Sequence, residues 1–206
     1  MLMKTLFKTL ILPHVDYCSQ LWMPVKTMEI LKIEKLQKDF LNRIPALKGM
    51  NYWQKLELLK MTSIQRRQER YRIMYTWKIL EGLAPNCGIQ TSTLGDQRQG
   101  RKCKIPKIKT GAKASARAAR EQTFQVHGAQ LFNCLPPFLR NMTKCSIDKF
   151  KEALDNYLKT IPDKQSVPGL TPTGTTPDAR PSNSLLHQRP RQQAQEERRR
   201  RTRPGT

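Results

Sequence analysis

Apolar residues recur at helical spacing through the first half of the chain. After Pro24, four large apolar residues are separated by three, four and four positions, as in a helix that buries one stripe: Ile33, Leu36, Phe40 and Ile44. Thr27 is a suitable N-cap residue, and Pro45 cannot continue a helix. The pattern therefore predicts a helix over 27–44 whose core face carries this stripe.

Capping residues delimit two further helices. Asn51, with Gln54 three positions later, has the spacing of a capping box. Ser63 precedes a longer segment of periodic apolar residues, and Gly82 occupies the place of a C′ glycine that ends a helix. These signals predict helices over 51–60 and 63–81.

The second half of the chain alternates apolar segments with breaks. Phe124 and Val126 are spaced for a short extended piece, and the apolar stretch 130–135 ends at two consecutive prolines. Ser146 is an N-cap for a last helix over 146–159. The residues expected in the helical core are Ile33, Leu36, Phe40, Leu56, Tyr71, Met74, Phe150 and Leu154.

Charge divides the chain into segments of different character. The 206 residues include 38 Lys and Arg against 16 Asp and Glu, a formal net charge of +22. The most basic segment has few large apolar residues, so burial cannot offset the entropy of ordering it. We predict a helical module over 1–90, a basic flexible connector over 91–120, a small helical module over 121–161 and a disordered Pro- and Arg-rich tail over 162–206.

The predicted protein is therefore all-α, with a small helical core, a basic flexible connector and a disordered C-terminal tail. No apolar run approaches the roughly 18 residues that span a bilayer, and the five cysteines are scattered, as in reduced intracellular proteins. The N-terminal stretch partly resembles a signal peptide or presequence, but Lys8 interrupts its apolar core and no small-residue cleavage site follows. We expect a nuclear or cytoplasmic protein that is not secreted.

The sequence contains no recognisable catalytic or metal-binding motif. Successive cysteines are 69, 16, 31 and 11 positions apart, without the closely spaced pairs of a zinc site. No two aspartates are adjacent, and neither a phosphate-binding glycine loop nor a serine nucleophile motif occurs. We therefore predict no catalytic residue, no metal ligand and no cofactor.

The candidate binding residues are two groups of cations. Guanidinium groups on one helix face suit phosphate oxygens, and a basic segment without acidic neighbours favours polyanions. The alternative for the first group is a solvated helix face, and the alternative for the second is a solubilising role. For the tail cluster Arg198–Arg201, nuclear import or RNA contact and a solubilising role are all open. The candidates are Arg66, Arg67, Arg70 and Arg72 on the helix over 63–81, and Arg101, Lys102, Lys104, Lys107, Lys109, Lys113, Arg117 and Arg120 in the basic segment.

Five phrases, in this order and spacing, resemble the C-terminal part of reverse transcriptases from LINE-type (non-LTR) retrotransposons of animals. They are LFKTLILPHVDYCSQLWMP (6–24), IEKLQKDFLNRI (33–44), YWQKLELLKMTSIQRRQERYRIMYTWKILEGLAPN (52–86), FQVHGAQLFNCLPPFLRN (124–141) and SIDKFKEALDNYLKTIPD (146–163). The similarity corresponds to the thumb and the segment that follows the polymerase palm. Phe132 departs from the family pattern, which often has Trp at that position.

The resemblance implies a role in gripping the template–primer duplex, with RNA or DNA as partners through phosphate contacts and with no small-molecule substrate or membrane. Enzymes of that family share paired palm aspartates and typically have an N-terminal endonuclease, and neither occurs in this chain. None of the family's catalytic residues can therefore be carried over. We expect a truncated C-terminal fragment of an RNA-directed DNA polymerase, a nucleic-acid-binding module without a catalytic site; the alternative is a repurposed interaction or structural protein with no nucleic-acid role.

Overall fold

Helices dominate the protein, which is all-α as predicted. The computed structural model describes residues 2–24, 26–91, 100–106, 116, 119–120, 123–161, 163 and 185. Most of the predicted connector and nearly all of the predicted tail lie outside these residues. Within them, no helix is both long enough and apolar enough to cross a membrane.

The N-terminal residues form a succession of short helices. The helix α1 (Leu2–Leu6), the π-helical turn η1 (Phe7–Ile11) and α2 (Leu12–Asp16) follow one another directly, and α3 (Ser19–Trp22) comes after a tight turn. The Phe7 ring is buried against Phe40, with ring centroids 4.7 Å apart. This contact anchors the N-terminal helices to the next long helix.

The helices predicted between residues 27 and 81 are confirmed, with small differences at their ends. They are α4 (Thr27–Asn42), the short 3-10 turn η2 (Pro45–Leu47), α5 (Tyr52–Leu58) and α6 (Ile64–Leu80). Asn51 and Gln54 form the predicted capping box, and the Ser63 hydroxyl accepts the Arg66 amide. Gly82 has φ +73°, as a C′ glycine requires. The predicted cap of α4 was wrong by one residue, because Lys26 holds the N-cap position.

The buried face of α4 is not the predicted one. Leu36 is 54% exposed, and the rest of the predicted stripe is only half-buried. The buried residues are instead Ile30, Glu34, Gln37 and Leu41, which keep helical spacing but include two polar side chains. Hydrogen bonds permit this burial: the Gln37 amide donates to the Tyr52 hydroxyl and to the Thr62 carbonyl, both at 3.1 Å. A prediction based on apolar spacing selects the wrong stripe in such a helix.

Among the described residues of the second half, two short paired strands are followed by the helices α8 (Phe124–Cys134), α9 (Pro137–Arg140) and α10 (Ile147–Lys159). Strand β1 (Gln90–Thr91) pairs antiparallel with β2 (Cys103–Lys104). The last helix is capped by Ser146, as predicted. The extended piece predicted at Phe124 and Val126 was wrong. Both residues lie in the first turn of α8, because the buried residues continue at helical rather than alternating spacing.

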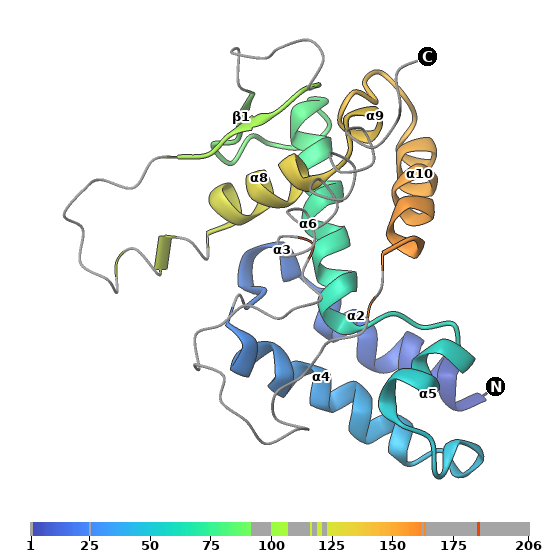
Figure 1. The fold of residues 1–206 in the computed structure, drawn as a ribbon. Coiled ribbons are helices and arrows are strands. Elements are labelled where there is room, and N and C mark those ends of the chain that lie inside the picture. The colour runs from blue at the N-terminus through green and yellow to red at the C-terminus, as the bar shows by residue number, and fades with distance from the viewer. Residues whose placement is uncertain are drawn as a thin grey trace, which may run out of the picture.

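The main core forms where α6 meets the C-terminal helices, as Figure 1 shows with α6 running through the middle of the molecule. Trp77 of α6 stacks on Phe150 of α10, with centroids 4.5 Å apart and ring planes inclined by 7°. A Cβ added to Gly128 of α8 would lie 2.9 Å from the Thr76 hydroxyl, so glycine permits the close approach of α8 to α6. The predicted modules over 1–90 and 121–161 therefore share one core.

Two leucines of α4 provide a matched test of its buried face. Leu41 is fully buried in a second cluster with Leu47, Tyr52 and Leu56, whereas Leu36 is exposed. We expect Leu41→Ala to lower the free energy of unfolding by about 2–5 kcal/mol, and Leu36→Ala to lower it by less than about 0.5 kcal/mol. Chemical denaturation measures both values. A greater loss of stability from Leu36→Ala than from Leu41→Ala would show that the stripe predicted from sequence is the buried one.

Candidate nucleic-acid interface

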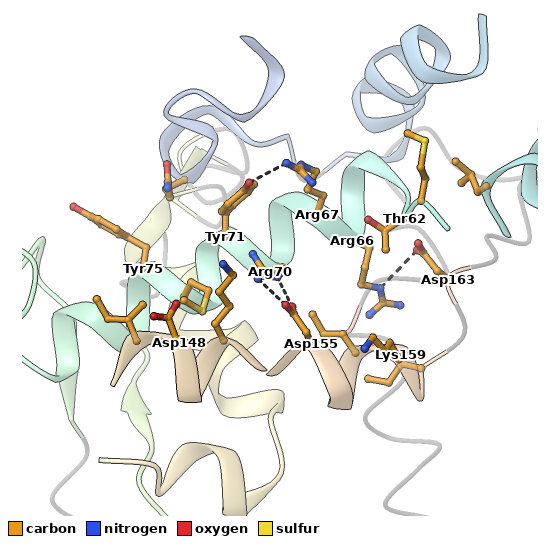
Figure 2. A pocket seen from close by; sticks show the side chains of 18 of the residues that line it. Thr62, Arg66, Arg67, Arg70, Tyr71, Tyr75, Asp148, Asp155, Lys159 and Asp163 are labelled. Carbon is orange, nitrogen blue, oxygen red and sulfur yellow. Dashed lines mark hydrogen bonds and ion pairs between the residues drawn. The ribbon is translucent and has the colours of Figure 1, made fainter. Parts of the chain in front are cut away.

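The four candidate arginines of α6 lie on a helix that is buried along most of its length. Of its 17 residues, those buried include Gln65, Arg66, Gln68, Glu69 and Arg72. Figure 2 shows this helix forming one wall of a groove, with α10 opposite. The arginines therefore have protein neighbours on several sides, and their contacts decide whether they are available to a ligand.

Arg67 and Arg70 are each held by an aspartate from a distant segment. Nε of Arg67 donates to both carboxylate oxygens of Asp16, to Oδ1 at 2.9 Å and to Oδ2 at 2.7 Å. Nη2 of Arg67 also donates to the Tyr71 hydroxyl at 3.1 Å. Arg70 makes a two-pronged contact with Asp155 of α10, of which the Nη2–Oδ2 distance is 2.9 Å. A carboxylate thus already occupies the guanidinium fork that would pair with a phosphate.

Arg66 and Arg72 are more deeply buried. Arg66 lies 3.6 Å from Asp163 and 3.9 Å from Glu69. Arg72 is completely buried and donates to the Met23 carbonyl at 3.2 Å and to Nδ1 of His127 on α8. Burial lowers the pKa of Arg72 to about 10. Both guanidinium groups are therefore held by contacts inside the protein.

Two carboxylates from other segments satisfy the amino end of α6. Asp163 accepts the Ser63 amide at 2.8 Å and its hydroxyl at 2.7 Å. Glu34 of α4 accepts the amides of Ile64 at 3.0 Å and of Gln65 at 3.3 Å, and the hydroxyl of Tyr52. The first amides of a helix lack partners within the helix and attract anions. This end of α6 is therefore an anion site occupied by the protein itself.

Burial dominates the ionisation of this cluster. It raises the pKa of Glu34 to about 7, although the Tyr52 hydroxyl and the Ile64 amide oppose the shift. Burial and the neighbouring Glu34 also raise the pKa of Tyr52. Burial thus favours the protonated form of Glu34, and its proton is coupled to the packing of α4, α5 and α6.

The groove between α6 and α10 has a volume of about 920 Å³ and mixed charge. Three of its cations are Arg66, Arg67 and Arg70, whose carboxylate partners Figure 2 shows in part. The remaining charged side chains of its wall are Lys78, Lys151 and Lys159 together with Glu57 and Asp148. With Asp155 and Asp163, the lining of the groove has six cations and four acids, so acids offset most of its positive charge.

Residues 100–106, within the predicted flexible connector, are fixed to the folded protein. Arg101 donates to Glu81 at 2.7 Å, and its amide donates to the Asn141 side chain at 2.9 Å. The Asn133 side chain accepts the Cys103 amide at 2.8 Å and donates to the Cys103 carbonyl at 2.9 Å. The prediction of a flexible connector was thus wrong for residues 100–106. The side chains of Asn133 in α8 and of Asn141 at the C-terminal end of α9 form hydrogen bonds with the backbone of this segment.

The other candidates of the basic segment differ in their placement. Lys104 and Arg120 are exposed, whereas Lys102 is half-buried. Lys107, Lys109, Lys113 and Arg117 lie outside the described residues, as does Arg198–Arg201. The structure thus brings the four α6 arginines together in internal contacts and does not gather the described cations of the basic segment beside them.

Sequence reasoning missed the residues that hold these segments together. Glu34 looks like one acid among the charges of α4, and Asn133 and Asn141 look like ordinary polar residues near breaks. A signal was present for Asn133, since it stands between Phe132 and Leu135 in an otherwise buried stretch, where an amide needs partners. The identity of those partners, which are backbone groups about thirty residues away, carried no sequence signal.

No protein-family model matches the chain, and neither curated proteins nor solved structures include a match to it. Among the described residues, no three His, Cys, Asp or Glu side chains gather in a group that could hold a metal ion. A function for this chain therefore rests on its own charges and contacts.

The pairing of Arg67 and Arg70 predicts a structural effect of their removal. Because each variant leaves a partly buried aspartate without its partner, Arg67→Gln and Arg70→Gln should each lower the free energy of unfolding by about 1–2 kcal/mol. The salt dependence of nucleic-acid binding should stay as in the wild type. Chemical denaturation and a nucleic-acid binding titration on the same preparations measure both quantities. If the free energy of unfolding is unchanged and the salt dependence of binding is weaker, these arginines contact phosphate instead.

The raised pKa of Glu34 predicts a pH dependence of stability. Between the ordinary value near 4.5 and about 7, the folded protein holds a proton that the unfolded chain has released, so this group's contribution to stability falls as pH rises through that window. The decrease is at most about 3 kcal/mol. Relative to wild type, Glu34→Gln should remove this decrease, as measured by denaturation from pH 4 to 8. Parallel curves for the two proteins would show that Glu34 has no raised pKa.

Proposed function

We propose that this chain is a basic helical module that binds RNA or DNA through phosphate contacts and has no catalytic site of its own. We propose further that it corresponds to the region after the palm of a non-LTR retrotransposon reverse transcriptase. The observation that carries the binding proposal is the positive charge that remains once the internal contacts are taken into account.

Internal contacts use nearly as many acids as cations. Among the described residues, six acids take part in them: Asp16, Glu34, Glu69, Glu81, Asp155 and Asp163. Seven described cations are buried or paired: Lys55, Arg66, Arg67, Arg70, Arg72, Arg101 and Arg140. Setting both groups aside changes the formal surplus only from +22 to +21. A surplus of this size favours polyanionic partners.

The assignment to a reverse transcriptase rests on the sequence resemblance. Its phrases coincide with packed elements of the structure: 33–44 with α4, 52–86 with α5 and α6, 124–141 with α8 and α9, and 146–163 with α10. Several of their polar residues, among them Asn133 and Asn141, bind the backbone of residues 100–106. This supports the proposal that the phrases form one structural module rather than separate short similarities.

A second candidate function is a protein-interaction module, and exposed apolar side chains favour it. Leu2 and Leu10 on the first helical turns are 73% and 61% exposed, and Tyr17 and Leu21 are 76% and 70% exposed. Exposed apolar patches on monomeric proteins often mark interfaces with other proteins. This alternative requires no nucleic-acid binding.

A titration with labelled nucleic acids separates the two functions. We expect the purified chain to bind RNA and DNA duplexes of unrelated sequence with similar affinity, because phosphate contacts carry no sequence information. The affinity should fall steeply with salt, with a slope of log K against log salt of about −3 or steeper on duplex DNA, since each phosphate contact contributes about −0.9. Fluorescence anisotropy at several salt concentrations measures the slope.

Absence of binding at low salt would overturn the proposed function and favour the interaction module. Binding confined to one base sequence would contradict the phosphate mode. Extension of a primed template by the purified chain would contradict the proposal that it has no catalytic site.

A further inference from the structure

The helix α4 presents more positive charge than its sequence indicates. Within its bounds, the three lysines Lys32, Lys35 and Lys38 are balanced by three acids, Glu29, Glu34 and Asp39. Glu34, however, is 6% exposed and faces the amino end of α6. Its burial leaves three lysines against two surface acids, and Arg43 follows directly at the C-cap.

Three of these cations lie on one face of the helix. Lys32, Lys35 and Arg43 are exposed and recur at spacings of three and eight residues, on the side opposite the buried Glu34 and Leu41. Within the described part of the chain, their side chains make no ion pair and no hydrogen bond. Asp39 is an acid on the same face, one turn from both Lys35 and Arg43, and exposed Glu29 lies three residues before Lys32. These three cations are called the outer face of α4.

We propose that the outer face of α4 is the surface that docks on the phosphates of a nucleic-acid duplex. The proposal rests on the proposed function and names the site at which it acts. From Lys32 to Arg43 the helix advances by about 16 Å at 1.5 Å per residue. Because the helix backbone is rigid, this row suits the regular phosphates of a duplex better than a single strand, whose phosphates have no fixed spacing.

Two other groups of cations among the described residues are matched by as many acids. On α10, the three lysines Lys149, Lys151 and Lys159 share the helix with three acids, Asp148, Glu152 and Asp155. In the groove, the α6 arginines are paired with carboxylates. The outer face of α4 therefore combines exposure, helical alignment and an excess of cations in a way that these two surfaces do not.

A pair of matched variants tests the location. The test variant is Lys32→Gln, Lys35→Gln and Arg43→Gln; the control variant is Lys149→Gln, Lys151→Gln and Lys159→Gln on α10. Both remove three positive charges from exposed positions, and glutamine has a helix propensity close to that of lysine and arginine. Full-length proteins are titrated with a labelled DNA duplex, a single strand and vesicles of anionic lipid, after circular dichroism has verified equal helical content.

The proposal predicts that the α4 variant loses about tenfold or more in duplex affinity and that its salt slope flattens by about 2 to 3. The control should stay within about twofold of wild type, and the single strand should lose less affinity than the duplex. Equal losses from both variants, or no loss from the α4 variant while wild type binds, would overturn the location and leave the proposed function intact. Failure of wild type to bind any nucleic acid would overturn both, and a loss confined to vesicle binding would assign the face to lipid instead.

Discussion

The burial of α6 imposes a requirement that the rest of the structure meets for most of its polar groups. This helix carries four arginines, one glutamate and two glutamines, yet most of its residues are inaccessible to solvent. Taking such groups out of water is costly unless each one finds a hydrogen-bonding or charged partner. The partners come from nearly every other part of the fold: Asp16 and Met23 from the N-terminal helices, Glu34 from α4, His127 from α8, and Asp155 and Asp163 from the C-terminal end.

This requirement links architecture to function. The arginines of α6, which look most suited to phosphate, contact carboxylates and carbonyls of other elements of the fold. The same contacts bury acidic side chains, most clearly that of Glu34. Because Glu34 is buried, the exposed surface of α4 carries more cations than acids. The polar helix at the centre and the excess of positive charge on α4 are thus two consequences of one packing arrangement.

Local signals in the sequence predicted most helix ends, whereas the direction in which polar residues face was not predictable. Asn51, Ser63 and Ser146 cap helices as expected, because capping depends on groups within one turn. The buried stripe of α4 was misjudged because its Glu34 and Gln37 are stabilised by partners from α5 and α6. For the same reason, neither the internal contacts of the α6 arginines nor the hydrogen bonds to residues 100–106 were predictable: their partners are distant in sequence and close only in the fold.

Hydrogen exchange at the start of α6 tests this account most directly. The first amides of a helix normally exchange fast because they have no partner within the helix. Here Ile64 and Gln65 donate to the buried carboxylate of Glu34. The account predicts that these two amides are protected about as strongly as that of Ile73 in the middle of the helix, so that they exchange only when the protein unfolds globally. Exchange at Ile64 and Gln65 close to the rate of an unstructured peptide, with Ile73 protected, would contradict the claim that buried partners from other segments hold α6 in place.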